Sequence, residues 1–205
     1  MESWQEIFAA HGCALPLAAW ALCLGGSGAE FDPCAYLEEH IKRAINREAI
    51  RERRRQRKLE LAMAQPLLPG VGEYIATARQ LGLKLGVASS SGRPWVRGHL
   101  DRLGVSAFFD CVTCADDVTR VKPDPELYQT ILAALDVRAD QAIVLEDSPN
   151  GVLAAKRAGL FCIAVPNPIT GQLCLDHADM RLTSLADVPL ARLLAKLCDY
   201  DRAHM

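Results

Sequence analysis

The sequence predicts an α/β fold in which helices cover both faces of a parallel sheet, preceded by a helical N-terminal domain. Three observations lead to this prediction. From Pro66 onward, short apolar runs alternate with segments of helical periodicity, which is typical of parallel sheets. The residues before Pro66 show mainly helical periodicity. Polar or charged residues follow several of the apolar runs, and ligands bind at the carboxyl ends of parallel strands.

The composition is that of an ordinary globular protein. The chain has 205 residues, of which 50% are hydrophobic and 23% are charged. This length accommodates one full-sized domain with a small appendage, and the apolar content excludes disorder over the whole chain. Because 23 Lys and Arg face 25 Asp and Glu, the formal net charge is −2, and we expect no nucleic-acid partner.

The longest apolar run, Cys13 to Leu24, has 12 residues and contains Pro16. A bilayer requires roughly 20 residues, so we expect no membrane partner. Glu2 and Glu6 precede the run without any Lys or Arg, which argues against a signal peptide. The sequence therefore predicts a cytoplasmic protein.

Residues 1–64 form the predicted helical domain. A short helix is expected from Glu2 to His11, ended by Gly12, and the GGSG segment at 25–28 breaks the chain. One longer helical stretch is expected from Pro33 to Ala64. Its many Lys and Arg residues alternate with Glu and lack aromatic neighbours, which favours a solvated helix face over a nucleic-acid surface.

Residues 65–205 form the predicted sheet domain. Pro94, Pro125 and Gly159 mark helix boundaries, because proline fits the first helical turn and glycine commonly follows the last. The expected strands are Leu83–Ser91, Phe108–Cys114, Gln141–Asp147 and Leu160–Val165. The expected helices are Pro94–Leu103, Asp124-Pro125 to Leu135, and Asn150–Ala158.

The chain has eight cysteines, and two of them, Cys111 and Cys114, form a C-x-x-C. This spacing is found in redox and zinc sites. In a strand, however, positions three apart face opposite sides, and no second ligand pair accompanies them. Buried free thiols are therefore the preferred interpretation.

Three of the predicted connections carry residues suited to a phosphate ligand. Ser89, Ser90 and Ser91 end one strand, Lys122-Pro123 follows the next, and Glu146-Asp147-Ser148 ends the third. Hydroxyls and backbone N–H groups bind phosphate oxygens, a lysine neutralises them, and paired carboxylates suit Mg²⁺. Together they form an electrostatic clamp for a transferring phosphoryl group.

The motifs GVASSSGRPWVRGHLDRLGV, VKPDPELY and IVLEDSPNGVLAAKRAG, in this order, resemble the haloacid dehalogenase-like hydrolase superfamily, in its phosphoglycolate phosphatase and β-phosphoglucomutase-like branch. The resemblance covers about residues 66–185. It implies a Rossmann-like core, with residues 1–64 as a helical cap domain. It also implies that Ser89 binds phosphate, that Lys122 neutralises the phosphate and the nucleophile, and that Asp147 and Glu146 hold Mg²⁺. Ser90, Ser91 and Arg93 are implied as substrate-binding residues.

The family's nucleophile is the first Asp of a D-x-D motif that ends the first core strand, and this sequence has no such motif. Asp32 has no D-x-D partner, and Asp116-Asp117 follows a different strand. We therefore expect the first strand to be missing, the sheet to be open where that strand would lie, and Mg²⁺ affinity to be poor. Unsatisfied backbone groups in such a gap would cost about 1–3 kcal/mol each.

The function implied by the resemblance is a Mg²⁺-dependent phosphatase that acts on small phosphorylated metabolites through an aspartyl phosphate. In the 205-residue chain itself we expect no turnover, because the nucleophile is absent. Two alternatives stay open: a non-catalytic module of the same fold, and a sugar-phosphate mutase. The mutase is less favoured because Gly92-Arg93 stands where that subgroup has Lys-Asn.

Overall fold

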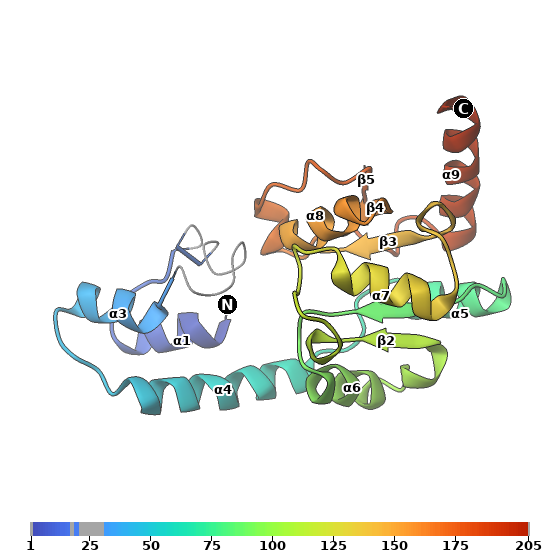
Figure 1. Cartoon of the computed structure of the whole chain (residues 1–205). Helices are drawn as coiled ribbons and strands as arrows, with labels where there is room; N and C mark the ends of the chain where they lie inside the picture. The colour runs from blue at the N-terminus through green and yellow to red at the C-terminus, as the bar shows by residue number, and fades with distance from the viewer. Residues whose placement is uncertain (1, 17–18, 21–30, 205) are drawn as a thin grey trace. The chain divides into compact units, whose positions relative to one another are not determined.

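The structure is a computed structural model, and it describes residues 2–16, 19–20 and 31–204, with side chains as far as 197 (Figure 1). The GGSG segment and part of the apolar run 13–24 lie outside these residues. The chain divides into two compact units, residues 1–65 and 66–205, and each is described by itself. In the described part of the chain, no helix is both long and apolar enough to cross a membrane.

The first unit is helical. It contains α1 (Glu2–Ala10), α3 (Pro33–Ile41) and α4 (Arg47–Ala64), with α1 packed on α4 (Figure 1). Phe8 and Leu37 are fully buried, and the Phe8 ring lies 6.0 Å from the ring of Tyr36. The predicted N-terminal helix is thus confirmed, and Gly12 after it has the positive φ of a helix C-terminus (+73°).

The single helix predicted over 33–64 was wrong, because the chain breaks between α3 and α4. Lys42 takes a left-handed conformation at the end of α3, with φ of 53°. Asn46 then starts a new helix by accepting a hydrogen bond from Ala49 N at 3.0 Å, as an N-cap residue does. Glu38 fixes the connection by accepting from Ile45 N at 3.2 Å.

Several basic side chains of α4 pair with carboxylates of the same unit. Arg57 contacts Glu6 at 2.8 Å and Glu60 at 3.1 Å, and Arg47 contacts Asp32 at 3.0 Å. These side chains are about two-fifths exposed or more, so the pairs contribute little to stability.

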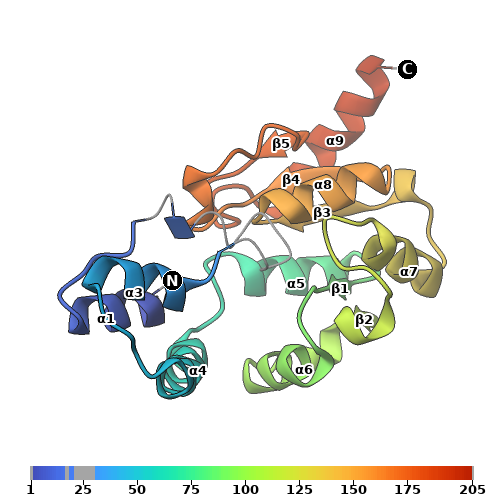
Figure 2. The same ribbon diagram turned by 60° about the vertical axis from the view of Figure 1, so that its left-hand side comes forward.

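The second unit is an α/β domain with parallel strands, which confirms the predicted fold class (Figures 1 and 2). Its elements in chain order are α5 (Val71–Gln80), β1 (Gly86–Ala88), α6 (Arg93–Arg102), β2 (Cys111–Thr113), α7 (Glu126–Leu135), β3 (Ile143–Glu146), α8 (Pro149–Arg157), β4 (Phe161–Ala164), β5 (Met180–Arg181) and α9 (Leu190–His204). The strands are shorter than predicted, and α5, β5 and α9 were not predicted.

Helices cover both faces of the sheet that contains β4. Cys162 and Ala164 of β4 pack with residues of α7 and α8, among them Tyr128 and Val152. Ile163 points to the opposite face, where it packs with residues of α5 and α9. Side chains alternate along a strand, so the all-apolar sequence of β4 follows from its burial on both sides.

The five strands found among the described residues form two sheets rather than one. β1 pairs with β2, and β3, β4 and β5 form the second sheet in that order. Within the described residues, no strand pairs with the second edge of β1 or with the second edge of β3. Leu145 of β3 is 39% exposed. This exposure fits the edge position of β3, because a central strand of an α/β sheet is normally buried on both faces.

Candidate active site

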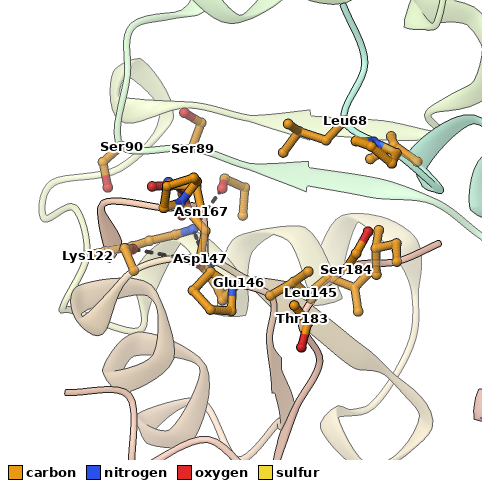
Figure 3. Close-up of a pocket in the computed structure, with 18 residues that line it drawn as sticks. Leu68, Ser89, Ser90, Lys122, Leu145, Glu146, Asp147, Asn167, Thr183 and Ser184 are labelled. Atoms are coloured by element: carbon orange, nitrogen blue, oxygen red, sulfur yellow. Dashed lines mark hydrogen bonds and ion pairs between the residues drawn. The ribbon is translucent and has the colours of Figure 1, made fainter. Parts of the chain in front are cut away.

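A cavity of about 580 Å³ lies in the second unit, at the carboxyl ends of β1 and β3 and beside the loop that follows β4 (Figure 3). Such ends are where open parallel sheets bind ligands. The residues of chemical interest around the cavity are Ser89, Ser90, Lys122, Glu146, Asp147 and Asn167. The sequence predicted all of these except Asn167.

Two of the residues predicted to bind substrate do not line the cavity. The guanidinium group of Arg93, at the start of α6, pairs with Asp117, and its backbone N–H donates to Asp116 at 2.6 Å. Ser91 is exposed, and its carbonyl oxygen accepts from Ala115 N at 3.1 Å. The structure therefore brings together only some of the residues that were predicted to bind the phosphate and the substrate.

The hydroxyl residues of the cavity follow β1. Ser89 N donates to Thr113 O of the neighbouring strand at 2.9 Å, which continues the sheet pairing to the edge of the cavity. The Ser89 hydroxyl accepts from Ser91 N at 3.1 Å, and this bond bends the chain away from the strand. The hydroxyl can still donate its own proton to a ligand oxygen.

Lys122 and Glu146 form a buried ion pair beneath the cavity. The two side chains are 11% and 7% exposed, and the Lys122 ammonium also donates to Ala88 O at 2.9 Å. The ammonium lies 4.8 Å from the centre of the Tyr128 ring. The Lys122–Pro123 peptide bond is cis. Lys122 therefore links the end of β1 to the end of β3.

Glu146 is engaged on both of its carboxylate oxygens. Oε1 accepts from the Lys122 ammonium and from the Tyr128 hydroxyl, and Oε2 accepts from Asp147 N at 3.2 Å. Burial and the Glu146 carboxylate raise the pKa of Tyr128 above its usual range, so its hydroxyl stays a donor. A Cβ atom at Gly151 would lie 1.8 Å from Oε2, so only glycine leaves room for this carboxylate.

Asp147 has a sparser environment than its neighbour. Its Oδ2 accepts from Asn167 Nδ2 at 3.0 Å (Figure 3). Burial, and then the Glu146 carboxylate, raise the pKa of Asp147 above the ordinary aspartate value. A nearby cation would offset both effects, which makes Asp147 the carboxylate of this cavity best suited to hold one.

Comparison with known proteins identifies the family. A model described as haloacid dehalogenase-like hydrolase matches residues 27–165. The chain belongs to the haloacid dehalogenase-like hydrolases. The family that the sequence motifs indicated is thus confirmed.

Individual relatives in this family match over different lengths. YhcW of Bacillus subtilis is 44% identical over 196 residues, which cover 96% of this chain and 89% of that protein. Validoxylamine A 7'-phosphate phosphatase of Streptomyces hygroscopicus is 42% identical over 119 residues, 58% of this chain and 55% of that protein. Among solved structures, a mutant of CbbY from Rhodobacter sphaeroides in complex with xylulose-(1,5)bisphosphate has a TM-score of 0.70 and 31% identity, over 94% of this chain and 90% of that chain.

The residues around the cavity fit Mg²⁺ with one direct protein ligand. Among the described residues, no group of three or more His, Cys, Asp or Glu side chains is arranged to hold a metal ion. Glu146 is engaged by Lys122 and Tyr128, whereas Asp147 is not paired with a cationic side chain. Mg²⁺ commonly binds through one or two carboxylates together with water and substrate phosphate, so Asp147 with Glu146 behind it matches that chemistry.

Sequence reasoning missed Asn167 and Tyr128. The resemblance implied that Ser148 to Gly151 shape the loop after the carboxylates, but it did not predict the close approach of Gly151 to Glu146. Tyr128 is the third residue of α7 and ends the motif VKPDPELY, but the motif did not indicate that its hydroxyl reaches Glu146. Asn167 lies in a PNPIT segment after the fourth predicted strand, and its neighbours marked only a turn.

Proposed function

We propose that this cavity is the phosphate site of a Mg²⁺-dependent phosphatase that acts on small phosphorylated metabolites. The observation that carries the proposal is the meeting of a hydroxyl, an ammonium and a carboxylate around one cavity, from Ser89, Lys122 and Asp147. Two relatives support the substrate class, since one is named for a 7'-phosphate and another was solved with a bisphosphate.

Each residue has a role in this proposal. Ser89 and Ser90 donate hydrogen bonds to the phosphate oxygens, and the Lys122 ammonium neutralises their charge. Asp147 holds the cation, and Glu146 keeps Lys122 in place. The cation itself would contribute charge stabilisation at the phosphoryl oxygens. Residues 1–64 act as the cap domain that selects the substrate, and residues 65–205 form the catalytic core.

None of the carboxylates among the described residues is placed to act as the nucleophile in this proposal. The carboxylates that line the cavity within the described residues are Glu146 and Asp147, and both have other tasks. Asp32 caps α3 and pairs with Arg47, while Asp116 and Asp117 bind Arg93. We therefore propose that a strand ending in D-x-D fills the space between β1 and β3, where both sheets have an unpaired edge.

In that arrangement, the first Asp of the added strand attacks phosphorus, and the bond between phosphorus and the ester oxygen breaks. Water then cleaves the aspartyl phosphate, releasing inorganic phosphate and regenerating the carboxylate. The second Asp donates a proton to the leaving alcohol and takes a proton back from the attacking water in the hydrolysis step. Without that strand, the 205 residues would clamp phosphate without turning it over.

The test compares two proteins for Mg²⁺-dependent phosphate release from an aryl phosphate. One is the 205-residue chain, and the other carries in addition the residues encoded upstream of Met1 as far as a D-x-D. We expect release only from the extended protein. In that protein K122M should lower the rate by about 100-fold or more, whereas the matched control K84M, at an exposed lysine of the same unit, should not.

If the 205-residue chain itself releases phosphate, and D147N abolishes this release, the proposal that the nucleophile comes from an added strand is wrong. An upstream region without an apolar strand and D-x-D, together with a stable chain that binds phosphate, would favour the non-catalytic alternative.

A further inference from the structure

The loop after β4 runs beside Asp147. In the parallel pair β3–β4, Glu146 lies opposite Ala164, and Val165 N donates to Glu146 O at 2.7 Å. The chain that leaves β4 therefore runs past the carboxyl end of β3, directly after the last pair of the two strands. Asn167 is the residue of this loop whose side chain reaches the Asp147 carboxylate (Figure 3).

The loop fixes which end of the Asn167 amide faces Asp147. Oδ1 accepts from Ile169 N at 2.9 Å and from Thr170 N at 3.1 Å, so this end of the amide is held as an acceptor. The NH₂ group is consequently the end that points to Asp147. An amide in the opposite orientation would place NH₂ against two backbone N–H groups and an oxygen against a carboxylate.

The backbone around Asn167 is also tied down. Asn167 N donates to Thr170 Oγ1 at 3.0 Å, and Gly171 N donates to Asn167 O at 2.8 Å. Thr170 is 5% exposed, so its hydroxyl is held in the packed part of the loop. The donor that reaches Asp147 is thus preorganised by four hydrogen bonds within the loop.

From this geometry we infer that Asn167 is a positioning residue for Asp147. Its NH₂ group occupies Oδ2, fixes the rotation of the carboxylate, and leaves Oδ1 for the cation. This inference rests on the proposed function, because it concerns how the Mg²⁺ ligand of that site is oriented. It adds a residue from the loop after β4 to a site otherwise built from the ends of β1 and β3 and from Lys122.

Outer partners of a metal-ligating carboxylate typically affect metal affinity 10- to 100-fold. Lys122 does not take this role, because its ammonium donates to Ala88 O and to Glu146 rather than to Asp147. Ser148 does not take it either, because its hydroxyl donates to Glu146 Oε2 at 3.4 Å and accepts from Gly151 N at 3.2 Å. Asn167 is therefore the side chain on which the orientation of Asp147 depends.

The test substitutes Asn167 while preserving the turn. N167S keeps a side-chain oxygen that can accept from the following N–H groups, as serine does in turns, but it loses the NH₂ group that reaches Asp147. Q172S is the matched control, since Gln172 is an exposed amide of the same loop that bonds Pro168 O instead. Mn²⁺ binding to the full chain is followed by electron paramagnetic resonance, and metal-free crystal structures give the position of the Asp147 carboxylate.

We expect N167S to weaken Mn²⁺ binding about 10-fold, Q172S to leave it unchanged and D147N to abolish it. In the crystal structure of N167S, the Asp147 carboxylate should rotate away from its wild-type position. If N167S does not fold, N167D retains the acceptor for Ile169 N and Thr170 N, and the position of Asp147 is the readout.

Two results would overturn the inference, and they differ in what they leave standing. Unchanged Mn²⁺ binding and an unmoved Asp147 in N167S, with binding lost in D147N, would remove the role of Asn167 and keep the proposed metal site. Mn²⁺ binding that D147N does not reduce would show that the cation binds elsewhere, and the proposed site and the inference would fall together.

Discussion

The two walls of the cavity are built differently. On the β3 side, Glu146 is buried, ion-paired with Lys122, bonded by Tyr128 and packed against Gly151. On the β1 side, Ser89 is half-buried and Ser90 is exposed, and Ser89 is held by a backbone bond from its N–H to Thr113 O of β2. The β3 side, with Glu146 and Lys122, is here called the charged wall, and it is part of the domain's core. The β1 side, with Ser89 and Ser90, is called the hydroxyl wall, and it is a strand end that can change without disturbing the core.

The largest effect is expected where the charged wall loses its carboxylate. E146Q leaves the Lys122 ammonium buried without its ion-pair partner, and breaking a buried pair in this way costs about 3 kcal/mol or more. The free energy of unfolding in urea measures the loss. D140N is the control, because it breaks the exposed pair between Asp140 and Arg138 and should have little effect.

A double substitution sharpens this prediction. K122M/E146Q removes both charges, so no buried charge is left without its partner. The double variant should therefore recover much of the stability that E146Q loses. If E146Q alone unfolds at the wild-type urea concentration, the two walls do not differ as described.

The second prediction concerns the steric fit of the same wall. G151A places a methyl group against the Glu146 carboxylate, and such overpacking costs about 1–3 kcal/mol. G98A in α6 is the matched control, because no atom within 4 Å would meet its Cβ, and alanine stabilises a helix interior by about 0.5–1 kcal/mol. Thermal unfolding should thus shift in opposite directions for the two variants. A G151A protein as stable as wild type would mean that Glu146 can move freely.

The sequence predicted those parts of the site that depend on topology alone. Parallel strands bring their carboxyl ends to one edge, so Ser89 and Asp147 could be placed together before any coordinates were known. The helix break at 42–46 escaped prediction because it depends on Glu38 and Asn46, which bond backbone groups that helical periodicity does not reveal. By contrast, α5 could have been predicted from the sequence, because its buried residues Tyr74 and Ala78 are four positions apart, as on one face of a helix.

Partners of individual side chains could not be predicted in this way. For example, Glu146 accepts hydrogen bonds from Lys122 and Tyr128, whereas Asp147 does not. Lys122 and Tyr128 are distant from Glu146 in sequence and meet it only through packing. Arg93 illustrates the converse, since it lies directly after the serines in sequence, but its guanidinium group pairs with Asp117 outside the cavity. Proximity in a motif therefore predicted the region of the site and not the orientation of each side chain.

The smallest expected effect lies at the amino ends of β1 and β2, away from the cavity, where Asp110 links the residues that precede the two strands. Its carboxylate accepts from Leu85 N at 2.8 Å and from Arg79 at 3.0 Å, and these two contacts, the backbone bond first, lower the pKa of Asp110. A lowered pKa in the folded state adds stability above the ordinary aspartate pKa of about 3.9, and that stability is lost as the pH falls through the folded value.

D110N should therefore unfold at a slightly lower temperature than wild type at pH 7, and the difference should shrink as the pH falls from about 3.9 through the folded pKa. Thermal unfolding of both proteins across that pH range measures it, with D101N at an exposed position of α6 as the charge-matched control. A difference that persists unchanged into acid would mean that the asparagine alters packing rather than an ionised hydrogen bond. The β1 side would then depend on shape, as the β3 side does at Gly151.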